Sequence, residues 1–153
     1  MRSVLTRALA LVSLLVVLVA VNGAILAKER IRANGQRIYL ELAPADPRSL
    51  MQGDYMALRF AIARNLSPDA SGSAALSIDA SGIAVLDPQP TKNSPRIRYR
   101  VRQGQVWLGT NAYFFEEGSA ARYAGARYGE FRLDRASGEA ILVGLRDEDL
   151  RAL

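Results

Sequence analysis

Residues 8–27 form an apolar run without a single charged side chain, and this run limits what the chain can fold into more than any other feature. At about 1.5 Å of rise per residue, roughly 20 helical residues span about 30 Å, the hydrocarbon thickness of a bilayer. Arg2 and Arg7 precede the run, and Lys28 ends it. We therefore predict four parts: an N-terminal segment at 1–7, a transmembrane anchor at 8–27, a linker at 28–36 and a domain at 37–153.

A cleaved signal peptide is the alternative interpretation of this run. The run is longer than the apolar core of a usual signal peptide, and it offers no clean small-x-small cleavage site before Lys28, which favours an anchor. The flanking charges leave the orientation open, because Lys28, Arg30 and Arg32 balance Arg2 and Arg7. A long C-terminal domain can cross the membrane regardless of its own charge.

The rest of the chain, about 120 residues, suffices for one domain with a modest core. The sequence contains no cysteine and no histidine, which excludes disulfides, thiol catalysis, Ser-His and Cys-His nucleophiles and most zinc sites. The net charge is +5, and apart from Lys28 and Lys92 the cations are arginines spread along the chain. A membrane surface explains this charge at least as well as nucleic acid does, so we expect no nucleic-acid partner and no cofactor.

Two-residue alternation of apolar and polar side chains dominates the domain and predicts strands. The connections at 79–82, 103–104 and 135–138 suit hairpins, the stretches 64–73 and 88–95 suit loops, and 119–126 suits a short helix with Ser119 as its N-cap. A last helical turn is expected at 147–150. The predicted class is mainly β: one antiparallel domain, a sandwich or a partly open barrel, with strands at 37–42, 75–78, 83–86, 96–102, 105–108, 128–133 and 140–145.

Residues 44–60 are predicted to form a stiff loop that leads into a further strand. Pro44 and Pro47 restrict the backbone, and Gly53 permits a positive φ just before the strand. From Tyr55 onward the alternation predicts one buried face, formed by Met56, Leu58, Phe60 and Ile62.

The same segment carries a family resemblance. Its residues resemble the signature for which the GDYXXLXY protein family is named, with Phe60 in place of the final tyrosine, and the segments 113–118, 127–130 and 142–146 are also similar to that family. The resemblance covers nearly the whole chain. It implies a small single-pass protein of the inner membrane, with a cytoplasmic N-terminus at 1–7 and its domain outside the cytoplasm, often encoded beside polytopic membrane proteins, in a family without an established activity. The expected interaction residues are Asp46, Pro47, Arg48, Gly53, Asp54, Tyr55, Leu58 and Phe60.

Four arginines alternate with apolar residues between positions 96 and 102, which places them on one face of a strand. One interpretation is a solvated face of an edge strand, where charges discourage pairing with other sheets. The other is contact with anionic lipid head groups or with an acidic patch on a membrane partner. The residues concerned are Arg96, Arg98, Arg100 and Arg102.

Acidic residues are plentiful, but no spacing demands an acid/base pair. Glu116 with Glu117, or Asp54 with Glu130, has the residue types of such a pair. Pairing with the many arginines explains these carboxylates more simply.

A hydrolase is the alternative to a binding protein. Leu50, Gly53 and Asp54 are similar to a short string that follows the nucleophilic serine of bacterial signal peptidases. The position of that serine falls on Ala45, and no lysine follows on a strand, since Lys92 lies in a predicted loop. We therefore expect a membrane-anchored, non-catalytic accessory or interaction protein, a subunit or partner of a polytopic membrane protein. A membrane-tethered hydrolase on a signal-peptidase-like scaffold is the other possibility.

Overall fold

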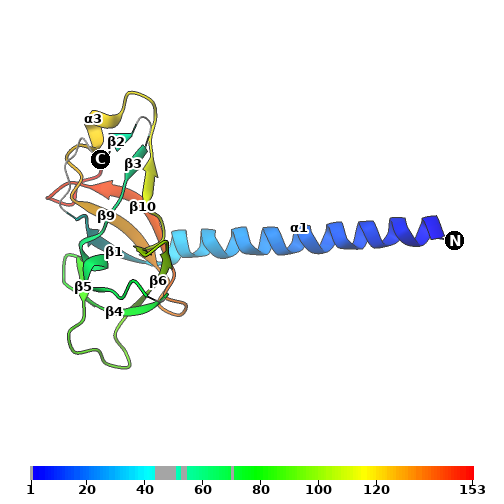
Figure 1. Cartoon of the computed structure of the whole chain (residues 1–153), viewed down its shortest axis with the longest axis horizontal. Helices are drawn as coiled ribbons and strands as arrows, with labels where there is room; N and C mark the ends of the chain where they lie inside the picture. Colours follow the sequence, from blue (N-terminus) through cyan, green and yellow to red (C-terminus); the bar gives the residue numbers. More distant parts are fainter. Residues whose placement is uncertain (1, 44–50, 53–54, 70) are drawn as a thin grey trace.

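The chain begins with one long helix that projects from a β domain (Figure 1). The computed structural model describes residues 2–43, 51–52, 55–69 and 71–153. Helix α1 (Arg2–Asn34) exposes its large apolar side chains between residues 9 and 26 by 50% to 67%. Within the described part of the chain it is the one helix long and apolar enough to cross a membrane. Burial in hydrocarbon removes this apolar surface from water, so α1 is a candidate membrane span.

Helix α1 continues through most of the predicted linker and ends at Asn34. Residues 28–34 are mostly good helix formers, and Glu29 and Arg32 add an ion pair three residues apart, at 3.8 Å. The amide of Gly35 donates the last helical hydrogen bond to the carbonyl of Ile31, over 2.8 Å. The domain is therefore joined directly to the helix, and residues 28–36 include hardly any irregular backbone.

The domain is mainly β, as the sequence predicts, and its described residues include one short α-helix. Its elements in chain order are β1 (Gln36–Glu41), β2 (Met51–Gln52), β3 (Tyr55–Ala57), the 3-10 helix η1 (Ala61–Asn65), β4 (Gly72–Ile78), β5 (Ala84–Leu86), β6 (Arg96–Arg102), β7 (Gln105–Trp107), β8 (Ala112–Phe114), α3 (Ala120–Tyr123), β9 (Tyr128–Leu133) and β10 (Ala140–Arg146).

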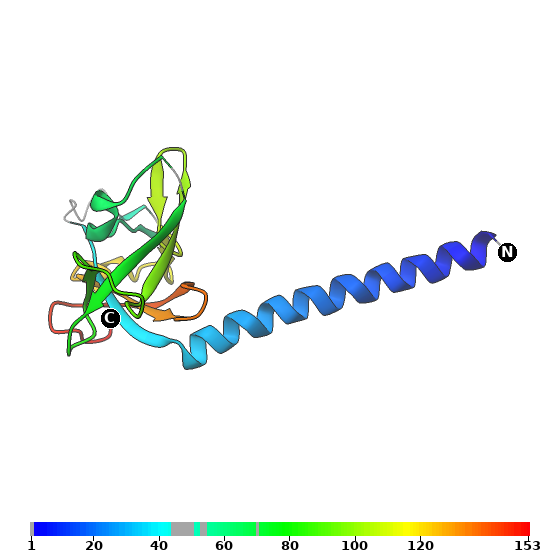
Figure 2. The same cartoon turned by 90° about the horizontal axis from the view of Figure 1, so that it is seen from below.

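The strands form three antiparallel sheets, ordered β1-β9-β10, β2-β3-β8 and β5-β4-β6-β7. Single contacts join the sheets to one another. An antiparallel bridge links Leu42 to Phe60, and a parallel bridge links Tyr39 to Ile83. The amide of Arg98 on β6 donates to the carbonyl of Gly138 in the β9–β10 turn, over 2.7 Å. These contacts hold the sheets around one core (Figures 1 and 2).

The core draws on all three sheets and on the segments between them. Seven of its nine largest fully buried side chains lie in strands, and the other two, Leu58 and Leu108, directly follow β3 and β7. These side chains are Phe131, Ile38, Leu40, Leu58, Leu76, Ile97, Leu108, Leu133 and Leu145.

Several local expectations need correction. The strand expected from Tyr55 ends at Ala57, although the predicted alternation of burial continues to Ile62. The expected loop at 64–73 begins inside η1 and ends in β4. Ser119 occupies the N-cap position of α3 without a capping hydrogen bond from its side chain. The expected helical turn at 147–150 is a non-helical turn, in which Leu150 adopts a positive φ of 62°.

Candidate functional site

The segment that carries the family signature, residues 53–60 and here called the signature segment, contributes buried apolar residues to the core. Leu58 is 2% exposed and Phe60 is 3% exposed, and both follow β3. The amide of Leu58 donates to the carbonyl of Asn111 over 2.7 Å, which ties the segment to the residue before β8. The predicted motif residues Asp46, Pro47, Arg48, Gly53 and Asp54 lie outside the described residues, and so does the predicted positive φ of Gly53.

Phe60 has a specific packing partner in the β1-β9-β10 sheet. Its ring meets the ring of Phe131 edge-on, with centroids 5.2 Å apart and an interplanar angle of 67°. A Cβ atom on Gly129 would lie only 2.9 Å from Cε1 of Phe60, so the glycine makes room for the ring. The last aromatic position of the signature therefore has a structural role in this chain.

Tyr55 and Phe114 form an aromatic edge on the surface. Phe114 is 75% exposed and lies on β8, which pairs with β3 through Tyr55 and Phe114. The two rings are tilted by 40°, with centroids 5.7 Å apart. Contiguous exposed apolar surface marks binding sites, and aromatic residues are enriched in them, so this pair is a candidate binding surface. Tyr55 is among the predicted interaction residues and Phe114 is not; the signals for Phe114 in the sequence are its aromatic segment and the similarity of residues 113–118 to the family.

A second aromatic cluster supports the strand that carries Phe114. The ring of Tyr123 on α3 lies 5.3 Å from the ring of Tyr113 and 5.1 Å from that of Phe115. Burial raises the pKa of Tyr113, and its hydrogen bond with Tyr123 raises that pKa further. Tyr113 therefore stays neutral at physiological pH and acts here as a packing residue.

The four exposed arginines at positions 96, 98, 100 and 102, here called the arginine row, lie on a strand in the middle of its sheet. Residues 96–99 of β6 pair with β4, and residues 100–102 pair with β7. The interpretation of this row as an edge-strand face is therefore wrong. The predicted alternation is confirmed, because the four arginines are exposed while Ile97 is fully buried.

A hollow of about 770 Å³, which we call the basic groove, lies along this row beside α1. Lys28 enters it from α1 and forms an ion pair with Glu139, which precedes β10. The guanidinium of Arg102 lies 5.4 Å from the ring centre of Trp107 on β7. Four cationic side chains thus share the groove with one carboxylate. Its lining residues are Lys28, Arg98, Arg100, Arg102, Trp107, Gly109, Thr110, Glu139, Ala140, Ile141 and Leu142.

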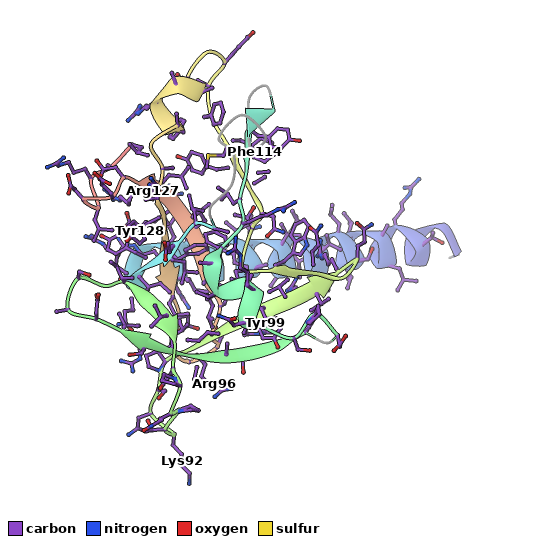
Figure 3. The ribbon with its side chains drawn as sticks, turned by 60° about the vertical axis from the view of Figure 1, so that its left-hand side comes forward. Lys92, Arg96, Tyr99, Phe114, Arg127 and Tyr128 are labelled. Atoms are coloured by element: carbon purple, nitrogen blue, oxygen red, sulfur yellow. The ribbon has the colours of Figure 1, made fainter. Side chains whose placement is uncertain are left out.

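A second hollow of about 730 Å³ adjoins the basic groove, and the two share Arg98 and Arg100. Arg96 lines this hollow too, but its guanidinium is held by Ser73, through contacts of 3.1 Å to the hydroxyl and to the carbonyl. Figure 3 shows Arg96 and Lys92 at the opposite end of the domain from Phe114. The Arg96 end of the row and the aromatic edge are therefore separate surfaces.

Glu130 is the one buried charged side chain among the described residues, at 3% exposure. Arg146 holds its Oε2 atom through Nε, at 2.7 Å, and through a second, shorter contact from its NH2 nitrogen. Arg37 and Arg132 approach Oε1 at 3.3 Å and 3.8 Å. The interpretation of Glu130 as an arginine-paired carboxylate is confirmed. Its carboxylate stands on β9 between arginines of β1 and β10, an arrangement that depends on strand order and is invisible in sequence spacing.

Comparison with known proteins agrees with the resemblance drawn from the signature. No match was found among curated proteins or among solved structures. The family model described as GDYXXLXY protein matches residues 17–145, which covers the C-terminal half of α1 and almost the entire β domain. The chain belongs to the GDYXXLXY protein family.

Proposed function

We propose that this protein is a membrane-anchored, non-catalytic accessory protein that binds a polytopic membrane protein through its aromatic edge and the adjoining signature segment. The observation that carries the proposal is the exposure of Phe114 beside Tyr55, on a domain joined directly to an apolar helix. A tether restricts the domain to the membrane surface and raises the effective concentration of any partner there. A modest aromatic surface is then sufficient for stable association.

The chemistry of the described side chains supports a binding role. The sequence has no histidine and no cysteine, so a catalytic base or nucleophile would have to come from other residue types. Glu130 is buried, as catalytic acids often are, but arginines contact both of its carboxylate oxygens. Both oxygens already have arginine partners, which leaves neither of them free to contact a substrate.

The proposal places α1 in the inner membrane and the β domain outside the cytoplasm. The length of the apolar run supports a span, and the outside location is carried over from the family resemblance. Fusions of an export-dependent reporter and of a cytoplasm-dependent reporter after Leu153 test the orientation. We expect activity from the export-dependent reporter alone, together with retention of the full-length protein in carbonate-washed membranes. A soluble, shortened product would contradict the anchor.

Co-purification from detergent-solubilised membranes tests the binding role. We expect a polytopic membrane protein to be retained by the wild-type chain and lost with Phe114→Ser. Val85→Ser is the matched control, because Val85 is a 53% exposed apolar residue on β5, away from the aromatic edge. Equal retention by the two variants would contradict binding at this edge. A Ser49→Ala protein that folds and binds normally but loses its cellular function would favour the hydrolase instead.

A further inference from the structure

The basic groove lies at the level where α1 leaves the bilayer. Lys28 is the first charged residue after the apolar run, so it marks the boundary between hydrocarbon and head groups. Its ion pair with Glu139 brings the start of β10 to the same level. Figure 2 shows the β9–β10 hairpin beside the end of α1, in agreement with this contact. The groove is therefore positioned at head-group depth.

The side chains of the groove suit a phosphate ester. Within the described part of the chain, no carboxylate pairs with Arg98 or Arg100, and both line the groove. Alternate residues on a strand lie roughly 7 Å apart, so both guanidinium groups can reach one phosphate. A guanidinium binds phosphate oxygens in pairs, which favours phosphate over a simple anion.

Trp107 adds a second property of a lipid-facing site. Its ring lines the groove and lies beneath the guanidinium of Arg102. Tryptophan is enriched at the boundary between hydrocarbon and water, where its ring lies at the level of the head groups. The groove thus combines cations for a head group with an aromatic surface for the upper part of an acyl chain.

We propose that the basic groove binds the head group of an anionic phospholipid, with its phosphate between Arg98 and Arg100. The tether holds the groove against the membrane, where lipid phosphate is always present at high density. This favours lipid over free phosphate and over an acidic segment of a partner protein. The proposal uses the membrane anchor of the proposed function but needs no protein partner, so either one can fail without the other.

Trp107 is the single tryptophan of the chain, which gives the groove its own reporter. The full-length protein is reconstituted without partners in nanodiscs of phosphatidylcholine with a minority of phosphatidylglycerol. In one preparation the phosphatidylglycerol carries bromine near the carbonyl end of its acyl chains, and in a second an equal amount of phosphatidylcholine carries it. We expect clearly stronger quenching of Trp107 fluorescence by the brominated phosphatidylglycerol, because that lipid is enriched at the groove.

A double variant tests whether the arginines cause the enrichment. Each basic residue near the surface contributes about fivefold to binding of anionic lipid, so Arg98→Gln with Arg100→Gln should lower the affinity for that lipid by about 25-fold and abolish most of the enrichment. Arg59→Gln with Arg64→Gln removes the same charge from two exposed arginines that do not line the groove. This control pair should keep the enrichment. Thermal melting of both proteins checks that they fold.

Three results would overturn the proposal. Equal quenching by the two brominated lipids would show that the groove does not select anionic lipid. An equal loss of enrichment in the control pair would assign the effect to net charge rather than to the groove. Release of the quenching by millimolar inorganic phosphate at constant ionic strength would show that the groove takes free phosphate instead of a lipid head group.

Discussion

Gly129 occupies a position where a side chain would collide with three others. A Cβ atom there would lie 2.9 Å from Phe60, 3.0 Å from Phe131 and 3.1 Å from Leu142. The first of these contacts comes from the signature segment, and the other two come from the sheet that contains Gly129. The glycine of the 127–130 motif and the last aromatic residue of the signature are thus parts of one packing arrangement.

Gly129→Ala should therefore destabilise the domain by about 1–3 kcal/mol, the usual cost of overpacking a core. Gly144→Ala is the control, since a Cβ atom at Gly144 would meet nothing within 4 Å. Thermal melting of the full-length proteins, followed by Trp107 fluorescence, measures the difference. Equal melting temperatures for the two variants would show that Phe60 does not pack as described.

The buried ion pairs of Glu130 lead to a second prediction about a single residue. Glu130→Gln leaves three arginines without their carboxylate, and breaking a buried ion pair usually costs about 3–5 kcal/mol. We expect the lower end of that range, because Arg37 is 55% exposed and keeps its hydration. Glu41→Gln, at an exposed position of β1, should change stability by less than about 0.5 kcal/mol. Chemical denaturation measures the free energy of unfolding of both variants. Equal values for the two variants would show that the Glu130 carboxylate is dispensable.

Hairpins are the elements that the sequence predicts best. The β6–β7 and β9–β10 hairpins each have a glycine in the turn, at Gly104 and Gly138, and both glycines adopt positive φ. Strand β6 adds a strong two-residue alternation of arginines with apolar residues. Strand β3 is the contrasting case. Its alternation continues to Ile62, but burial alone does not make a strand, because β8 provides pairing partners only for Tyr55–Ala57. Beyond that point the chain packs against the core and turns into η1.

The β9–β10 turn carries a pH-dependent contribution to stability. The Ser137 hydroxyl donates to the Asp134 carboxylate over 2.5 Å and lowers the pKa of Asp134, and the amide of Ala136 lowers it further. A lowered folded-state pKa means that the carboxylate stabilises the fold above its unfolded pKa of about 3.9. That contribution is lost as the pH falls through the folded-state pKa.

Asp134→Asn should accordingly lower the melting temperature by a constant amount between about pH 5 and pH 8. Below about pH 4 the wild-type protein also loses its carboxylate, so the difference between the two proteins should shrink. Melting curves recorded across this range test the sign. A difference that is as large at pH 3 as at pH 7 would contradict the role given to the charge.

The basic groove and the aromatic edge are each assembled from segments that lie far apart in the sequence. The basic groove takes Lys28 from α1, arginines from β6, Trp107 from β7 and Glu139 from the start of β10. The sequence predicts the charged face of β6, but the hollow beside α1 depends on how the sheets and the helix meet. The aromatic edge likewise depends on the pairing of β3 with β8. Single components of each surface are therefore predictable from the sequence, whereas their assembly depends on the tertiary structure.

Photo-crosslinking in living cells tests the central claim most directly. A photoreactive phenylalanine analogue placed at position 114 replaces an exposed ring with a ring of similar shape, and the same analogue at position 85 serves as the control. We predict one prominent crosslinked product from position 114, containing a polytopic membrane protein, and no such product from position 85. A product of equal yield from both positions, or none from position 114 while the protein remains membrane-bound, would contradict the proposed role of the aromatic edge.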